Sequence, residues 1–240
     1  MLHMNMDKLG RASVLNVQGL SFSYPDRPLF ADWSACFEPG VTWLRGRNGS
    51  GKTTLMKLLA GALPAACGRL ELAGMEIGEQ PLEYRRALFW VGPDVLPFNH
   101  LTPAEYFGFV ARLYPRFDHT ALDSHVAGFA LAAQLAVPLR TLSTGTQRKV
   151  WIAAALVSGT EAILLDEPIS ALDAASRTHL TKVLAACAAE RRHICIISSH
   201  EDFGAATAQA TVLALDESWG RSMRRKKLSH RLRQAVFVIP

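Results

Sequence analysis

The segment at residues 46–53 has the residue types and spacing of a phosphate-binding loop: it reads Gly-Arg-Asn-Gly-Ser-Gly-Lys-Thr and fits G-x-x-x-x-G-K-[ST]. A short apolar run at 41–44 leads into it, and residues 54–60 are predicted to form a helix. Glycines there let backbone N–H groups point inward, and a helix N-terminus attracts an anion. The segment predicts a nucleoside triphosphate site at which Lys52 reaches the β- and γ-phosphates and Thr53 ligates Mg²⁺. The residues expected in it are Asn48, Gly49, Ser50, Gly51, Lys52, Thr53 and Thr54.

Two carboxylates, Asp166 and Glu167, directly follow a second apolar run. The first can hold Mg²⁺ through water, and the second can polarise an attacking water. Taken alone, this pattern is also typical of a strand followed by an acidic turn. Two other segments strengthen the catalytic interpretation. His200 ends a further strand-like run, where it can reach a γ-phosphate, and the small residues at 142–146 open another predicted helix, 147–156, whose N-terminus can face a phosphate.

The elements that must position these residues are predicted to be strands and helices in alternation. Short strands are expected at 13–18, 20–24 and 35–37, with a turn at 25–28. The alternating segment 69–73 is typical of a half-exposed strand. From 102 to about 136 the pattern turns helical and begins with a capping box, Thr-Pro-Ala-Glu. Continuous apolar runs, typical of strands buried on both faces of a parallel sheet, occur at 88–91, 162–165, 194–197 and 212–215.

The composition favours a globular protein, since 49% of the 240 residues are apolar and 20% are charged. No apolar run approaches the ~20 residues that span a bilayer, so the chain is expected in the cytosol, or at a membrane only through a partner. Seven cations lie between 221 and 233; without them, 19 basic and 21 acidic residues remain. This tail is either a solvated terminus or a weak contact for anionic lipid or an acidic partner. Nucleic-acid binding is not expected, because no basic stripe with interleaved aromatics occurs elsewhere.

Two further groups of side chains have less specific patterns. The aromatics at 106, 107 and 109 would fit the groove of a partner, although packing within a helical core explains them equally well. The histidines at 100, 119, 125, 179 and 193 show no metal-ligand spacing. We expect these histidines at the surface or at helix caps.

Taken in order, these motifs resemble those of the nucleotide-binding subunit of an ATP-binding cassette (ABC) transporter. The resemblance runs from about Val14 to Leu215 and includes the phosphate loop, the signature motif at 142–146, the carboxylate strand, the D-loop at 170–173 and the switch histidine. It implies an α/β fold with a P-loop NTPase core, a mostly parallel sheet, an N-terminal antiparallel β subdomain and an inserted helical subdomain. It also implies ATP and Mg²⁺ as ligands, two cassettes that close head to tail, and a separate membrane-spanning subunit.

The resemblance assigns roles to individual side chains. Glu167 would be the catalytic base, and His200 would position the water and the γ-phosphate, together with the catalytic Lys52. Ser143 and Gly145 would contact the γ-phosphate held by the phosphate loop of the other cassette. Asp173 would couple the two sites. Tyr24 would lie against adenine, or would simply pack beside the turn that follows it.

The sequence departs from the family pattern at two places. Thr144 and Thr146 replace a glycine and a glutamine of the usual signature, and we expect slightly altered packing of that loop. Asp94 stands where the family places a glutamine that contacts Mg²⁺ and the attacking water. An aspartate can still ligate Mg²⁺, but it adds negative charge and donates no hydrogen bond. Our hypothesis is that Asp94 slows turnover or alters coupling; the alternative is that it faces solvent.

The expected organisation is a leader at 1–12, a cassette at 13–217 with helical subdomain 95–158, and a basic tail at 218–240. The predicted function is ATP hydrolysis that powers transport, at the cytoplasmic face of a membrane. Export is favoured over import because no regulatory domain follows 215 and because the signature is a variant. Two alternatives stay open: a soluble cassette ATPase, for example in cofactor assembly, and a non-catalytic scaffold that only binds ATP. The retained Lys52, Asp166 and Glu167 argue against the scaffold.

Overall fold

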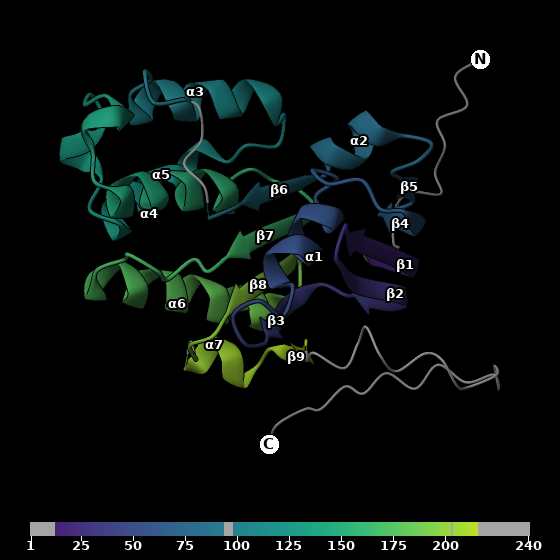
Figure 1. Cartoon of the computed structure of the whole chain (residues 1–240). Helices are drawn as coiled ribbons and strands as arrows, with labels where there is room; N and C mark the ends of the chain where they lie inside the picture. Colours follow the sequence, from purple (N-terminus) through teal and green to yellow (C-terminus); the bar gives the residue numbers. More distant parts are fainter. Residues whose placement is uncertain (1–12, 94–97, 203, 216–240) are drawn as a thin grey trace, which may run out of the picture.

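The computed structural model describes residues 13–93, 98–202 and 204–215, which form two sheets and a group of helices (Figure 1). The arrangement confirms the predicted α/β fold with a parallel sheet and a separate antiparallel sheet. The expected leader, Asp94 and the basic tail lie outside the described residues. Within the described residues, no helix is both long and apolar enough to cross a membrane.

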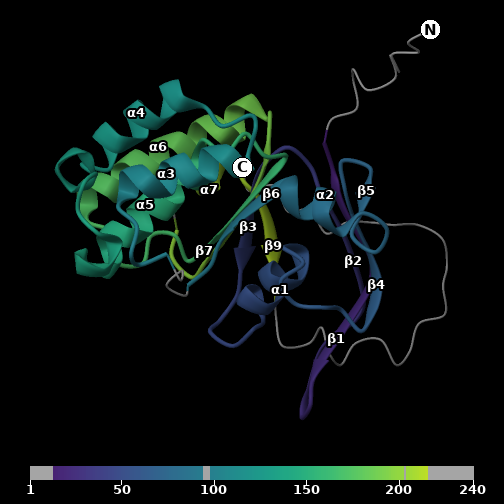
Figure 2. The same cartoon turned by 90° about the horizontal axis from the view of Figure 1, so that it is seen from above.

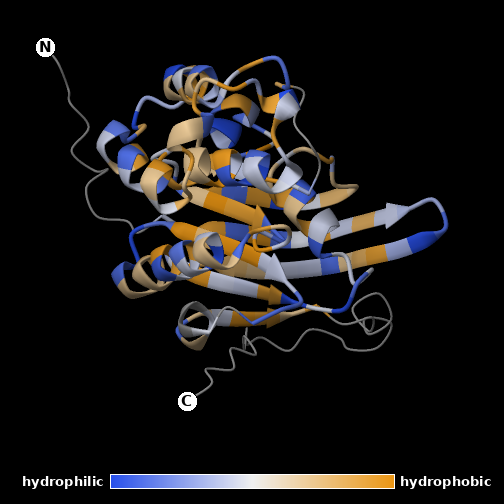
Figure 3. Cartoon of the chain, turned by 90° about the vertical axis from the view of Figure 1, so that its left-hand side faces the viewer, coloured by the Kyte–Doolittle hydropathy of each residue, from blue (hydrophilic) through white to orange (hydrophobic). Residues whose placement is uncertain are grey.

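The parallel sheet forms from the continuous apolar runs. Its strands lie side by side in the order β6 (Leu88–Val91), β7 (Ala162–Asp166), β8 (Ile194–Ser199), β3 (Gly40–Arg45) and β9 (Thr211–Ala214), and the paired strands are all parallel. Every residue of β7 and β8 is buried, as the apolar runs predict. In Figure 3 these central strands are coloured largely as hydrophobic. The carboxyl ends of β3, β7 and β8 therefore meet at one edge, where the candidate motifs follow.

Helices cover one face of this sheet, and the other face packs on α1 (Lys52–Leu59) and the antiparallel sheet (Figure 2). The alternation of side chains along β7 shows the two layers. Ile163 and Leu165 belong to the apolar cluster that includes α3 (Pro103–Leu113), whereas Leu164 belongs to the cluster around α1. Apolar cores therefore pack on both faces of the strand. This packing fixes the position of the strand end, which is followed by polar residues.

The antiparallel sheet has the order β2 (Arg27–Phe37), β1 (Leu15–Tyr24), β4 (Cys67–Leu72) and β5 (Met75–Glu76). The prediction of two strands at 13–18 and 20–24 was wrong, because one strand absorbs the interruption through register shifts. The predicted strand at 35–37 is much longer: it starts directly after a two-residue turn. A proline at position 28 is tolerated there because β2 lies at the sheet edge among the described strands.

The helical region follows the capping signals of the sequence. The Thr102 hydroxyl accepts from the N–H of Glu105, and the Glu105 carboxylate accepts from the N–H of Thr102, so the predicted capping box is present. The remaining helices, including two short 3₁₀ turns, are α2 (Pro81–Arg86), α4 (His119–Gly128), Ala132–Gln134, Leu139–Thr141, α5 (Thr144–Leu156), α6 (Ala174–Glu190) and α7 (Ala205–Ala208).

Two expectations about helices and burial need correction. The helix expected at 147–156 begins three residues earlier, at Thr144, because the hydroxyl of Ser143 caps it. The run at 212–215 was predicted to be buried on both faces, but β9 lies at the sheet edge and its residues are half-buried or exposed. Of the two interpretations of the aromatics at 106, 107 and 109, core packing applies to Tyr106 and Phe107, which are buried, whereas Phe109 is exposed.

His125 was predicted at the surface or at a cap, but it is buried between α4 and α6. Its Nδ1 lies 3.1 Å from Nε2 of His179, and both rings pack around Phe129. The pKa of His125 is lowered to about 4, mainly by burial and also by the nearby His179, while Asp118 opposes the shift. Burial also lowers the pKa of His179, assisted by Lys182. The folded protein therefore keeps this pair neutral.

We expect the free energy of unfolding to fall as the pH drops from about 6.5 to about 4. The unfolded chain binds a proton at His125 near pH 6.5, whereas the folded chain resists it, so the unfolded state gains protons first. The loss attributable to His125 is about 2 kcal/mol between pH 7 and pH 4.5. Urea unfolding across this range measures it.

The variant His125→Gln should flatten that pH dependence, and His193→Gln, an exposed histidine, should not. An unchanged slope in His125→Gln contradicts the assignment of the pH dependence to the buried pair.

Candidate nucleotide-binding site

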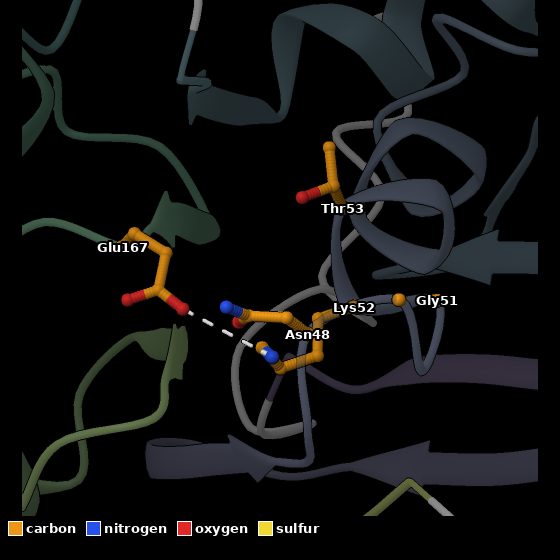
Figure 4. A pocket seen from close by; sticks show the side chains of 6 residues that line it. Asn48, Gly51, Lys52, Thr53 and Glu167 are labelled. Atoms are coloured by element: carbon orange, nitrogen blue, oxygen red, sulfur yellow. Dashed lines mark ion pairs between the residues drawn. The ribbon is translucent and has the colours of Figure 1, made fainter. Parts of the chain in front are cut away.

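A pocket of about 290 Å³ joins the phosphate loop to the end of β7. Figure 4 shows Asn48 and Lys52 pointing toward Glu167, with Thr53 at the start of α1. The residues that line this pocket are Asn48, Gly49, Gly51, Lys52, Thr53 and Glu167. Five residues predicted for phosphate binding therefore share one pocket with the predicted base.

The loop's path depends on backbone conformations that suit glycine. Gly51 has φ +100° and stands at the N-cap of α1, so a side chain there would be strained. The first turn of α1, whose N–H groups have no partners within the helix, begins at the pocket, since Lys52 and Thr53 line it. Ser50 does not line the pocket: it is buried, and its hydroxyl has no hydrogen-bond partner among the described residues.

Lys52 is buried, and its ammonium is held by the loop itself. Its Nζ donates to the carbonyl oxygens of Gly46 at 2.7 Å and Arg47 at 3.2 Å, and it lies 4.0 Å from Oε1 of Glu167. A cation fixed at this place attracts a negatively charged group entering the pocket. The geometry suits Lys52 to phosphate binding.

Asp166 is fully buried at the end of β7. Its Oδ1 accepts from the hydroxyl of Ser198, which stands opposite it on β8, and its Oδ2 has no partner among the described residues. A buried carboxylate oxygen without a partner is costly in the absence of a cation or a water. Together with the half-buried Thr53 hydroxyl, it supplies oxygen donors of the kind Mg²⁺ prefers. The residues present therefore fit the metal.

The backbone of Glu167 adopts an unusual conformation, with φ +48°. Its N–H donates to the carbonyl oxygen of Ser198 at 3.0 Å and to the hydroxyl of the same residue at 3.2 Å. This turn points the carboxylate between Lys52 and His200, whose Nδ1 lies 3.1 Å from Oε2 of Glu167. The structure therefore brings Glu167 and His200 together, and Ser198 holds the main chain of Glu167 in this turn.

The signature segment caps α5. The Ser143 hydroxyl accepts from the N–H of Thr146 at 3.1 Å and lies 2.9 Å from the Thr146 hydroxyl. Gly145 approaches the D-loop so closely that a Cβ would lie 2.4 Å from the carbonyl oxygen of Ala171. Neither Ser143 nor Gly145 is among the residues that line the pocket. The structure therefore places these two residues at the start of α5, outside the lining of the pocket.

Asp173 is likewise outside the pocket lining, at the N-cap of α6. Its carboxylate accepts from the N–H of Ser176 and pairs with Lys149 of α5. These contacts, the hydrogen bond from Lys149 first, lower the pKa of Asp173. Asp173 is therefore ionised and ties α6 to the signature helix.

Tyr24 is 45% exposed at the tip of β1, and a ring that stacks on adenine must be exposed in this way. Its hydroxyl lies 3.2 Å from the hydroxyl of Thr54, and its ring meets Phe22 edge-on. Packing and adenine contact are both compatible with this placement. Thr54 is buried and contacts Tyr24 rather than lining the pocket.

Three residues at the site were missed from the sequence. Arg27 of β2 donates to the carbonyl oxygen of Gly49 at 3.0 Å, Ser198 holds Asp166, and Arg148 of α5 donates to main-chain oxygens at the end of β7. The two serines that interrupt the apolar run before His200 were the available signal for Ser198. Arg27 and Arg148 resemble ordinary charged surface residues in the sequence, so no local signal marked them.

Comparison with known proteins gives a consistent result. Residues 31–170 match the ABC transporter family. The chain belongs to this family. It is 35% identical to the cytochrome c biogenesis ATP-binding export protein CcmA of Rhodospirillum rubrum, over 80% of this chain and 81% of that protein. It is 28% identical to the protein of the same name from Yersinia pestis, over 87% of this chain and 96% of the relative.

Solved structures agree with the fold. An ABC transporter ATP-binding protein from Pyrococcus furiosus superposes with a TM-score of 0.69 and 26% identity, over 84% of this chain and 97% of that one. A bacterial Atm1-family ABC exporter with ATP bound gives a TM-score of 0.72 at 23% identity, over 86% of this chain and 38% of that one. The chain is therefore an ABC ATP-binding subunit, an ATPase whose hydrolysis is coupled to transport.

We expect Gly145→Ala to lower the ATPase rate of this subunit about tenfold or more. The added Cβ would overlap the Ala171 carbonyl, so the signature segment or the D-loop must shift, and small misplacements at such a site are costly. Steady-state phosphate release measures the effect.

The matched control is Gly78→Ala in an exposed turn, where the nearest atom, Oε1 of Glu76, would lie 3.7 Å from the new Cβ. Equal rates for Gly145→Ala and Gly78→Ala would contradict the packing argument.

Proposed function

We propose that this subunit binds MgATP in a head-to-tail dimer of cassettes and powers export through a separate membrane-spanning subunit. The observation that carries the proposal is the shared pocket. The Lys52 ammonium, from the start of α1, and the Glu167 carboxylate, directly after β7, both line it and lie 4.0 Å apart. A fixed cation and a fixed carboxylate at this separation suit a γ-phosphate and its attacking water.

In the proposed mechanism, ATP displaces the Lys52 ammonium from the loop carbonyls to its own phosphates. Glu167 accepts a proton from the attacking water, and His200 orients that carboxylate through its Nδ1. Mg²⁺, when bound by Thr53 and Asp166, would supply further neutralisation of phosphate charge. The N–H groups of the loop at 49–53 hold the phosphate oxygens.

The dimer is proposed from what the pocket lacks. Ser143 and Gly145 present a helix N-terminus that can bind an anion, yet they do not line the pocket of their own chain. A second cassette would supply this N-terminus to the γ-phosphate, and Asp173, beside it, would sense the closure. Tyr24 would stack on adenine from the exposed tip of β1.

The proposed contact with the membrane subunit is the outer face of α3. Phe109 and Leu113, one turn apart on this helix, are 37% and 50% exposed, although the neighbouring Tyr106 and Phe107 are buried. Such a pair of large apolar side chains at the surface is typical of a protein contact. The names of the CcmA relatives include export, which supports export for this chain. On this proposal the subunit works at the cytoplasmic face of a membrane.

Two alternatives are distinguished by experiment. A non-catalytic scaffold would not need a base, whereas the main chain of Glu167 is held in a left-handed conformation that aims the carboxylate at the pocket. A cassette ATPase that acts without a membrane subunit shares the whole pocket, so only its partners separate it from the transporter.

Replacing Glu167 with Gln should lower the ATPase rate about a hundredfold or more while ATP still binds, because the amide cannot accept the proton. Lys52→Ala should abolish detectable ATP binding. Phosphate release and equilibrium binding of a fluorescent ATP analogue are the two measurements.

Glu83→Gln on the exposed face of α2 is the matched acid-to-amide control. A wild-type protein that binds ATP without turnover would support the scaffold instead, and a wild-type rate in Glu167→Gln would remove Glu167 as the base.

The membrane partner is tested by affinity purification of the tagged full chain from detergent-solubilised membranes of its native cell. We expect a polytopic membrane protein to co-purify, and the double variant Phe109→Ser, Leu113→Ser to lose it while keeping its ATPase activity. Recovery of soluble partners alone, with no cassette in the membrane fraction, would overturn the transporter assignment.

A further inference from the structure

Arg148 is a buried cation that the ATP site does not use directly. It is 6% exposed, within a helix, α5, whose buried side is otherwise mostly apolar. Its Nη2 donates to the main-chain oxygens of Asp166 and Glu167, the latter at 2.9 Å. Burial lowers the pKa of its guanidinium, opposed by the charges of those two carboxylates. An arginine nevertheless keeps its charge, so this contact is a charge-assisted clamp on the main chain.

The contact from Arg148 is made where the main chain is strained, at Glu167. Glu167 leaves the strand in a left-handed conformation, which a residue with a side chain adopts only when neighbours hold it. Its N–H is held by Ser198, and its carbonyl oxygen accepts from Arg148 and from the N–H of Ser170. Main-chain contacts on both sides of the residue thus decide where its carboxylate points.

The same helix is joined to the following loop at two more places. Gly145 lies against the carbonyl oxygen of Ala171, and Lys149 pairs with Asp173. Three positions of α5, Gly145, Arg148 and Lys149, therefore contact the segment that carries Glu167. A displacement of α5 must either move Glu167 with it or break the contact from Arg148.

We propose that Arg148 is a positioning residue that transmits the position of the signature helix to the catalytic carboxylate of the same chain. Binding of the other cassette's phosphate at the N-terminus of α5 would then set the aim of Glu167. The inference rests on the proposed function, because it takes Glu167 as the base and a second cassette as the ligand of α5.

Arg148→Met should lower kcat for ATP hydrolysis about tenfold to a hundredfold, since a small misplacement of a catalytic group is costly. The KM for ATP should stay within about threefold, because the phosphate loop is untouched. Arg148→Lys should recover most of the rate: the ammonium replaces the Nη2 donor, and the Nε of Arg148 has no partner among the described residues to lose. Arg86→Met, an exposed arginine of α2, is the control and should match wild type.

A double-mutant cycle separates positioning from a merely structural role. In single-turnover hydrolysis, Arg148→Met should cost nothing further when added to Glu167→Gln, because the group that it aims is already disabled. Multiplying losses would overturn the proposal. Loss of binding of the fluorescent ATP analogue would show that Arg148→Met does not fold. In that case the rates of Arg148→Gln and Arg148→Lys are compared instead, and the same differences are expected.

The outcomes also separate this inference from the proposed function. If Glu167→Gln is inactive while Arg148→Met turns over at the wild-type rate, only the role of Arg148 is overturned. If Glu167→Gln retains the wild-type rate, Glu167 is not the base, and the positioning role falls with it.

Discussion

The site depends on one constraint, the parallel register between β7 and β8, which sets Asp166 directly opposite Ser198. This pairing lets a serine hydroxyl and carbonyl of one strand hold the carboxylate of Asp166 and the N–H of Glu167 on the next. The register itself comes from apolar residues packed on both faces of each strand. The two apolar cores therefore determine, through strand alignment, where two charged groups sit at the sheet edge.

Charge balance explains why the pocket tolerates these groups. Lys52 is nearly buried, but loop carbonyls and the Glu167 carboxylate surround its ammonium, so its charge is compensated before any ligand enters. Asp166 is the opposite case, since one of its buried oxygens lacks a partner among the described residues. A compensated cation that lines the pocket and a buried carboxylate with an unpaired oxygen at the end of β7 therefore favour a ligand that brings negative phosphates together with a divalent cation.

Sequence reasoning was strongest where long apolar runs or glycine spacing leave one physical solution. The runs that became β6, β7 and β8 and the loop before α1 were predicted correctly, because double-sided burial and a tight phosphate turn each demand a recognisable pattern. It failed where tertiary contacts decide. The apolar run of β9 lies at an edge, and His125 is buried against a residue 54 positions away. Arg148 and Lys149 are adjacent cations, and nothing local shows that Arg148 is buried against main-chain oxygens while Lys149 pairs with the exposed carboxylate of Asp173.

The position of Arg148 bears on how two cassettes could share work. In the proposed dimer, the N-terminus of α5 would gain a negatively charged ligand when the nucleotide of the other cassette reaches it. If α5 moved independently of β7, the binding of a phosphate at the N-terminus of α5 would have no effect on hydrolysis in the chain that contains this helix. Contacts from Gly145, Arg148 and Lys149 instead join α5 to the segment 166–173. Packed elements shift between discrete arrangements rather than deform smoothly. In the proposed dimer, a phosphate bound at the N-terminus of α5 would therefore select the arrangement in which the Glu167 carboxylate of the same chain is correctly aimed.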